Sequence, residues 1–230
     1  AENLFGGRNV PIAWRAFAIA RKRPWNTAKR ASASRATVLK GWTSNSYEKI
    51  EEGEQSMEIR QLERRDYFGK KFTVRYKTHG YYDVCATEHG FLLKYARFEK
   101  PIEKSFDDEF FGEWLENPVA FGAFENGEII GYVEGSAESW NNRFRISNVV
   151  VFDNENRKRG VGTLLMNAIM KKAEEAKARM IVLETQSCNE TAIAFYKSQG
   201  FEIIGFDLYS YSNDDPARHE VRIEMGKKIL

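Results

Sequence analysis

The sequence predicts an α/β fold in which a central mixed β-sheet is flanked by helices. Three observations support this prediction. Short apolar segments with strand-like composition fill the region 119–152. A segment at 161–177 carries its apolar residues on one helical stripe and its charges largely off it, as an amphipathic helix does. After it come a short apolar strand, another helix and two closing strands, so helices and strands alternate in the C-terminal part of the chain.

The first half of the expected fold begins at Met57. We expect a strand at 57–63, an aromatic segment at 72–98 whose structure the pattern does not determine, and a helix near 105–116 that is rich in Phe and Trp. Strands are expected at 119–124 and 128–134. The residues between them contain Asn126-Gly127, the dipeptide most typical of a tight hairpin turn.

The second half contains the more regular elements. We expect a strand at 144–152, the helix at 161–177, a short apolar strand at 180–185 and a helix at 190–198 that ends at Gly200. The closing strands are expected at 201–211 and 221–227.

The composition fits one globular domain with a real core. The chain has 230 residues, of which 42% are apolar and 30% are charged. Its two cysteines, Cys85 and Cys188, are far apart, and its three histidines show no metal-ligand spacing. We therefore expect no disulfide framework, no metal and a reducing cytoplasm. No apolar run approaches the length of a membrane span.

Charge is distributed unevenly along the chain. Residues 1–47 hold nine basic residues and one acidic residue, a net charge of +8, whereas the remainder carries −6. A basic arm therefore precedes an acidic domain.

Three interpretations of this arm stay open. It could bind nucleic acid, or be a transit peptide, since those are rich in Arg and Ser and poor in acids. It could also be a tag or translated leader, because residues 1–7 resemble a degraded protease tag and Met57 begins a plausible first strand. We favour the last, and divide the chain into 1–56, a basic leader, tag or arm, and 57–230, the folded domain.

The most informative motif is an apolar strand that runs into a basic, glycine-punctuated turn and then a helix. Asn148-Val149-Val150-Val151 is followed by Arg157-Lys158-Arg159-Gly160-Val161-Gly162-Thr163. Glycines let the backbone approach a ligand, and the first N–H groups of a helix lack intrahelical partners and favour an anion. The spacing matches neither the Gly-x-x-x-x-Gly-Lys loop of nucleoside triphosphatases nor the full Gly-x-Gly-x-x-Gly dinucleotide motif. Glycine-rich turns also occur before helices without any ligand.

This motif resembles the acetyl-coenzyme A (acetyl-CoA) signature of the GNAT N-acetyltransferase superfamily. A second motif agrees: the segment from Asn189 to Phe201, with Phe195-Tyr196 and Gly200-Phe201, is similar to the family's second conserved helix. Leu183-Glu184-Thr185-Gln186 and Tyr209-Ser210-Tyr211-Ser212-Asn213 resemble the streptothricin acetyltransferase branch. The similarity covers roughly 105–230, and weakly 57–104.

The resemblance implies a GNAT-like fold for 57–230, with acetyl-CoA as cosubstrate. It implies that the backbone edge of the strand at Val149–Val151 binds the pantetheine arm while the basic turn surrounds the pyrophosphate. The cofactor-binding residues are then expected to be Val149, Val150, Val151, Arg157, Lys158, Arg159, Gly160, Val161, Gly162, Thr163, Asn189 and Tyr196.

Tyr196 is the general acid that the resemblance implies. It lies seven residues after Asn189, about two helical turns, so both residues share one helix face. A phenol with an ordinary pKa near 10 is protonated at neutral pH and can protonate a departing thiolate. The alternatives are that Tyr196 only packs and that Asn189 only caps its helix.

A cationic acceptor needs carboxylates that bind its ammonium group and take its proton. Glu134 is the candidate base, and Glu138, Trp140, Glu184 and Tyr209 are the candidate acceptor-binding residues. Each acid alone could equally be solvated or salt-bridged.

The expected function is acetyl transfer from acetyl-CoA to a primary amine of a small cationic acceptor, with streptothricin as first candidate and hence antibiotic resistance. Polyamine, aminoglycoside and protein acceptors stay open as alternatives, as does a non-catalytic coenzyme A-binding regulatory module. A small-molecule amine is the expected partner, a membrane and nucleic acid are not, and a homodimer is left open.

Overall fold

The computed structural model describes residues 46–52, 55–152 and 156–229, and for 46–56 it describes only the backbone. These residues belong to one compact unit, Thr43–Leu230. The elements, in chain order, are β1 Ser46–Glu52, β2 Gln55–Gln61, α1 Arg64–Tyr67, β3 Lys71–Thr87, β4 Gly90–Glu109, β5 Val119–Glu125, β6 Glu128–Glu138, β7 Arg143–Val151, α2 Val161–Glu175, β8 Met180–Gln186, α3 Glu190–Ser198, β9 Glu202–Asp207, α4 Asp215–Arg218 and β10 Arg222–Lys228.

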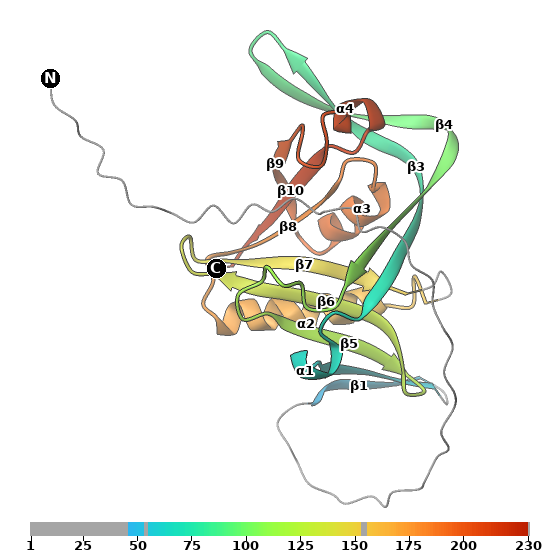
Figure 1. Ribbon diagram of the computed structural model, residues 1–230, viewed down its shortest axis with the longest axis vertical. Coiled ribbons are helices and arrows are strands. Elements are labelled where there is room, and N and C mark those ends of the chain that lie inside the picture. Colours follow the sequence, from blue (N-terminus) through green and yellow to red (C-terminus); the bar gives the residue numbers. More distant parts are fainter. Residues whose placement is uncertain (1–45, 53–54, 153–155, 230) are drawn as a thin grey trace, which may run out of the picture. The chain divides into compact units, whose positions relative to one another are not determined.

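Eight strands form one mixed sheet, in the order β1-β2-β5-β6-β7-β8-β10-β9 (Figure 1). Its neighbouring strands are antiparallel except β7 and β8, which are parallel and joined by α2. The mixed α/β fold expected from the sequence is therefore confirmed, and the expected strands and helices of the region 119–200 lie within a few residues of their predicted positions.

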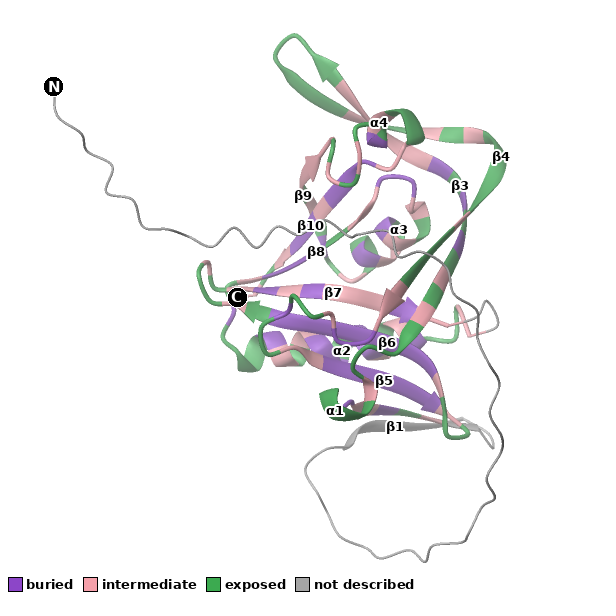
Figure 2. Cartoon of the chain, viewed as in Figure 1, coloured by how far each residue is buried: buried purple, intermediate pink, exposed green. Residues whose placement is uncertain are grey.

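The main core lies between the sheet and the apolar face of α2. Leu165, Met166 and Ile169 of this helix are fully buried, and α2 packs on β5, β6 and β7 (Figure 2). Side chains alternate between the faces of a strand. Val133 of β6 therefore joins this core, while Tyr132 joins a smaller aromatic cluster.

The hairpin between β5 and β6 confirms the turn predicted from Asn126-Gly127. Glu125 pairs with Glu128, and the two residues between them have φ values of 50° and 83°. Both central positions of this turn type require positive φ, which Asn and Gly tolerate best.

The aromatic segment for which the sequence predicted no structure forms a long hairpin. β3 and β4 pair from Lys71–Glu109 to Thr87–Gly90 and make up a second, two-stranded sheet. The hairpin passes α3 and approaches α4, and its tip is exposed (Figures 1 and 2).

The prediction of a helix near 105–116 is wrong. β4 continues to Glu109, and the chain then turns, with Phe111 at a φ of 59° and Asn117 at 49°. Tertiary packing overrides the local pattern here: the Phe110 ring lies 4.4 Å from that of Tyr132 and 5.0 Å from that of Phe72. The aromatic residues whose spacing suggested one face of a helix pack instead on the sheet face opposite α2.

The first closing strand is shorter than the predicted 201–211. β9 ends at Asp207, whose side chain accepts a hydrogen bond from the Tyr209 N–H (3.1 Å) and so starts a turn. The short helix α4 follows, stabilised by the buried Asp215, whose carboxylate accepts bonds from the Tyr211 N–H and the Ser212 hydroxyl.

The division of the chain at residue 56 stays a prediction. Residues 1–45 lie outside the described part of the chain. Within the rest of that segment, β1 pairs antiparallel with β2.

Candidate functional site

The central feature of the site is a fork in the sheet. β7 and β8 pair only through Arg143–Arg145 and Met180–Val182 and separate beyond these residues. Within the described part of the chain, the β8-facing edge of residues 146–151 therefore pairs with no strand. Its backbone N–H and C=O groups are available to an extended ligand that enters the fork.

A β-bulge lies on β7 just inside the fork. Glu134 of β6 pairs with Asn148, whereas the next residue, Gly135, pairs with Ile146, so Ser147 is the extra residue. The Ser147 hydroxyl donates a hydrogen bond to the Glu134 carbonyl (3.2 Å). A bulge bends its strand and redirects nearby groups, which makes this position suited to a reaction site.

The N-terminus of α2 opens at the same end of β7. Gly160 occupies the N-cap with a φ of 84°, a conformation that glycine adopts without strain, and no described side chain caps the helix. The first helical hydrogen bond runs from the Leu164 N–H to the Gly160 carbonyl (3.0 Å). The N–H groups of Val161, Gly162 and Thr163 are thus free to bind an anion.

The basic side chains before α2 are partly engaged with protein groups. Arg159 forms a bidentate ion pair with Glu125 and also donates to Asn156 (3.0 Å). Its hydrogen bonds hold the pKa of the Glu125 carboxyl below the ordinary value. Arg157 donates to the Arg75 carbonyl of the hairpin. Lys158, at a φ of 63°, lies beside them in the turn.

The second predicted helix, α3, faces the N-terminus of α2. A Cβ atom added to Gly162 would lie 3.2 Å from the Phe195 ring, so the two helices meet closely at this point. Asn189 caps α3 by accepting a hydrogen bond from the Ala192 N–H (3.2 Å). The capping role considered for Asn189 is therefore present, and it occupies the side-chain oxygen.

Tyr196 lies in the core side of α3 with only 8% of its surface exposed. Burial raises the pKa of its hydroxyl to about 12. The phenol therefore stays protonated across the neutral range, as a proton donor must.

Glu134 is the most unusual side chain of the site. It is 0% exposed, and neither carboxylate oxygen has a hydrogen-bond partner among the described residues. Burial raises the pKa of this carboxyl to about 7, although Tyr132, Asn148 and Ser147 lie close enough to oppose part of that effect. A carboxyl that titrates near neutral pH is suited to act as a general base.

The two other candidate acids belong to an ion-pair network on the sheet face opposite α2. Arg145 contacts Glu138 (2.6 Å) and Glu184 (3.7 Å). Arg222 also contacts Glu184 (3.7 Å) and reaches Asp207 and Glu224. The salt-bridged alternative considered for Glu138 and Glu184 is thus what the structure shows, and Arg145 stands where the fork begins.

The two candidate aromatics of the acceptor site are exposed, and Trp140 precedes the paired residues of β7 rather than the open edge. Trp140, 84% exposed, belongs to the turn between β6 and β7. That turn contacts the start of β8: the Arg179 N–H donates to the Asn142 carbonyl (2.9 Å). The turn is therefore at the opposite end of β7 from the N-terminus of α2. Tyr209, 60% exposed, follows β9.

The sequence did not indicate that the β3–β4 hairpin forms a wall of the site. The Tyr76 hydroxyl donates to Gln186 at the end of β8 (2.7 Å), and the Tyr82 N–H donates to the Ser187 carbonyl (2.9 Å). Glu190, at the start of α3, accepts from the His79 N–H (2.7 Å) and the Tyr95 hydroxyl. These contacts join residues about a hundred positions apart, so no local pattern could have revealed them.

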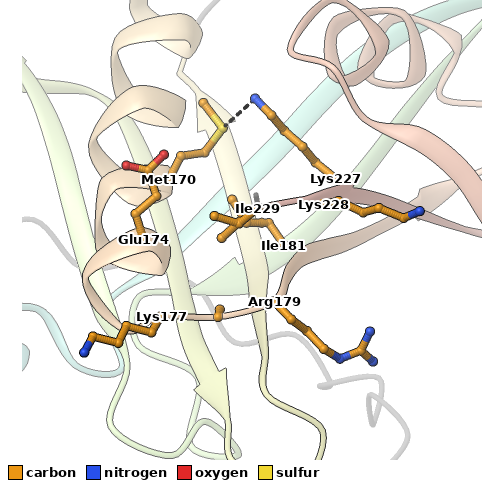
Figure 3. Close-up of a pocket in the computed structure, with 9 residues that line it drawn as sticks. Met170, Glu174, Lys177, Arg179, Ile181, Lys227, Lys228 and Ile229 are labelled. Atoms are coloured by element: carbon orange, nitrogen blue, oxygen red, sulfur yellow. Dashed lines mark hydrogen bonds between the residues drawn. The ribbon is translucent and has the colours of Figure 1, made fainter.

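A separate hollow lies at the other end of α2, near the first residue of β8 (Figure 3). None of the predicted site residues lines it. The lining residues are Met170, Glu174, Lys177, Ala178, Arg179, Ile181, Lys227, Lys228 and Ile229.

Two negative findings concern the described residues alone. They contain no group of three or more His, Cys, Asp or Glu side chains placed to hold a metal ion. No helix in the described ranges has the length and apolar character that crossing a membrane requires.

Comparison with known proteins agrees with this geometry. The family model described as "Acetyltransferase (GNAT) family" matches residues 58–201. A streptothricin acetyltransferase of Escherichia coli is 30% identical over 139 residues, which are 60% of this chain and 77% of that protein. Streptothricin acetyltransferase A of Bacillus subtilis (strain 168) is 32% identical over 130 residues, 55% of this chain and 73% of the relative.

Among solved structures, nourseothricin acetyltransferase is similar with a TM-score of 0.63 and 25% identity. The match covers 76% of this chain and 99% of that one.

Proposed function

Since the chain belongs to the acetyltransferase (GNAT) family and is an acetyl-CoA-dependent N-acetyltransferase, we propose that its acceptor is a primary amine of streptothricin or a closely similar cationic compound. One observation supports the binding of acetyl-CoA most directly: the open edge of β7 leads to the uncapped N-terminus of α2. An extended thioester whose far end carries phosphates matches this arrangement.

In this proposal the N-terminus of α2 binds the pyrophosphate of acetyl-CoA. The N–H groups of Val161, Gly162 and Thr163 donate to the phosphate oxygens, and the helix dipole adds to the attraction. Lys158 and Arg157 supply positive charge. Arg159 contributes less directly, because its guanidinium lies on Glu125.

The pantetheine arm then lies along the free edge of β7. Its amide groups hydrogen-bond the backbone of Val149–Val151, as an added strand would. The thioester comes to rest near the bulge at Ser147, within the fork. Asn189 and Tyr196, at the start and end of one face of α3, line the other wall.

Glu134 and Tyr196 divide the acid–base work. Glu134 is the final acceptor of the proton that the acceptor ammonium loses, and the free amine attacks the thioester carbonyl carbon. As the C–N bond forms and the C–S bond breaks, Tyr196 protonates the departing thiolate and regains a proton from the amide nitrogen. One proton remains on Glu134 and passes to solvent, so the protons balance.

The acceptor is proposed to be cationic because the residues beyond 47 carry a net charge of −6. The network around Glu184 adds half-exposed carboxylates beside the fork. We keep Glu138, Glu184 and Tyr209 as acceptor-binding residues. Trp140 is proposed only for a large acceptor that extends along the sheet, because it lies at the far end of β7.

The test is a panel of acceptors, assayed by release of coenzyme A thiol. We expect the highest kcat/KM with streptothricin, compared with spermidine, an aminoglycoside and a lysine-bearing peptide. A clear preference for the peptide or for spermidine would refute the streptothricin assignment. Binding of acetyl-CoA without thiol release for any amine would favour the regulatory module instead.

Replacing Tyr196 by Phe is expected to lower kcat about 100-fold, the lower end of what a positioned proton donor contributes. The affinity for acetyl-CoA should change little, because the ring and its packing on Phe201 remain. Steady-state kinetics and calorimetric titration measure the two quantities. Phe195→Leu, in the neighbouring position, is the control for altered packing, and unchanged kcat in Tyr196→Phe would assign Tyr196 to packing alone.

We propose that residues 57–230 carry the activity and that the protein acts in the cytoplasm. Cys85 and Cys188 are both free thiols, which suits a reducing compartment.

A further inference from the structure

Asp108, near the end of β4, lies close enough to Glu134 for its charge to act on it, although the two residues belong to different sheets. Its cross-strand partner is Phe72. Phe72 and Phe110, the residue two positions after Asp108, both pack on Tyr132, which precedes Glu134 by two positions on the same face of β6. The Phe111 N–H also donates to the Tyr132 hydroxyl (3.0 Å). The hairpin is thus anchored where it brings Asp108 toward Glu134.

Asn148 connects the two carboxyls. It is the cross-strand partner of Glu134, next to the bulge. Its amide lies close enough to both Asp108 and Glu134 to lower the pKa of each. Three elements, β4, β6 and β7, therefore contribute one polar group each to a small cluster.

The charge of Asp108 acts on Glu134. Burial raises the pKa of Asp108, and the charge of Glu109 adds to this effect. The negative charge of Asp108 in turn raises the pKa of Glu134, in addition to the larger effect of burial. Tyr132 is a further titratable group that acts on Glu134, and its hydroxyl lowers the pKa of this carboxyl.

The two carboxyls differ in access. Glu134 is fully buried and its oxygens have no described partner, so a bound ammonium group cannot touch it directly. Asp108 is half-buried, and its Oδ1 accepts a hydrogen bond from the Glu109 N–H (2.8 Å). Asp108 is therefore the outer member of the pair, and Glu134 is the inner one.

We propose that Asp108 is a further catalytic residue, which binds the ammonium group of the acceptor and passes its proton to Glu134. This inference rests on the proposed acetyl transfer. The N–H bond of the ammonium breaks, the proton moves to a carboxylate oxygen of Asp108, and from there it moves to a carboxylate oxygen of Glu134. The amine keeps the electron pair with which it attacks the thioester.

The kinetic test compares Asp108→Asn with Asp107→Asn, using whichever amine the wild-type enzyme turns over fastest. Asp107 is the matched control, because it is an exposed neighbour that points to the other face of the hairpin and hydrogen-bonds Thr73. We expect Asp108→Asn to lower kcat/KM for the amine about 100-fold and leave acetyl-CoA affinity unchanged. Asp107→Asn should stay within about twofold of wild type. Equal values for both variants and wild type would overturn the proposal.

The second readout is the pH dependence of kcat/KM. If Asp108 had only a structural role, its replacement would not shift this dependence. Because Asp108→Asn removes the negative charge beside Glu134, the acidic limb of kcat/KM should move to lower pH. Carbon NMR of the Glu134 carboxyl should show the same fall in pKa with no acceptor present. An unmoved Glu134 pKa would refute the pairing. Asp108→Ser serves as a smaller replacement should the Asn variant fail to fold.

The NMR measurement separates this inference from the proposed function. If streptothricin proves not to be a substrate but the Glu134 pKa still falls in Asp108→Asn, the carboxyl pair stands and the acceptor assignment fails. If streptothricin is acetylated and the pKa does not move, the acceptor assignment stands and the pair fails.

Discussion

Replacing Gly162 by Glu is expected to abolish acetyl-CoA binding, with at least an about 100-fold loss of affinity, equivalent to about 2.7 kcal/mol. The new side chain would bring a negative charge to the first turn of α2, where phosphate is proposed to bind, and that turn contains no acid in the native chain. Its Cβ would also approach the Phe195 ring to 3.2 Å. Calorimetric titration with acetyl-CoA measures the loss.

Two controls separate charge from fold. Asn167→Glu places the same charge on an exposed position of α2 beyond the first turn, and should leave affinity within about twofold. Gly162→Ala adds the close contact with Phe195 without the charge, so it should lose only part of the affinity. Unchanged binding in a folded Gly162→Glu protein would show that the pyrophosphate binds elsewhere.

Replacing Glu134 by Gln is expected to lower kcat at least about 100-fold at pH 8, because the isosteric amide cannot accept the ammonium proton. In the wild type, kcat/KM for the acceptor should rise with pH as Glu134 loses its proton near pH 7. In Glu134→Gln, kcat/KM should no longer rise with pH in this range. Glu128→Gln, at the exposed start of β6, is the control for removing a charge from this strand.

The same substitution should stabilise the protein. The pKa of Glu134 rises from an ordinary 4.5 to about 7 on folding, so the folded state binds more protons between these values and stability falls as pH rises through that window. Gln is neutral, so it avoids the cost of burying an ionised carboxylate. We expect Glu134→Gln to raise the free energy of unfolding by about 3 kcal/mol at pH 8 and by little at pH 4. Urea denaturation at the two pH values measures this. Equal stability at pH 8 would mean that Glu134 is not buried as a charge.

Local patterns predicted most of the fold between residues 119 and 200. The Asn126-Gly127 turn, the helix after Gly160 and the Asn189 cap each depend on a few neighbouring residues, and each lies where it was expected. The prediction failed over residues 105–116. There, aromatic spacing imitated a helix, but pairing with β3 and packing on Tyr132 decided the structure.

By itself, the sequence determined the family, the order of strands and helices, and the residues proposed to hold acetyl-CoA, because backbone conformation and helix-terminus chemistry are local. Only the tertiary structure decided what the charged residues do. It pairs Arg159 with Glu125 and Arg145 with Glu138 and Glu184. It also buries Glu134 and brings Asp108 close enough for its charge to act on Glu134. The pKa of a carboxyl depends on its burial and on neighbouring charges. Both are set by residues that only the folded chain brings together.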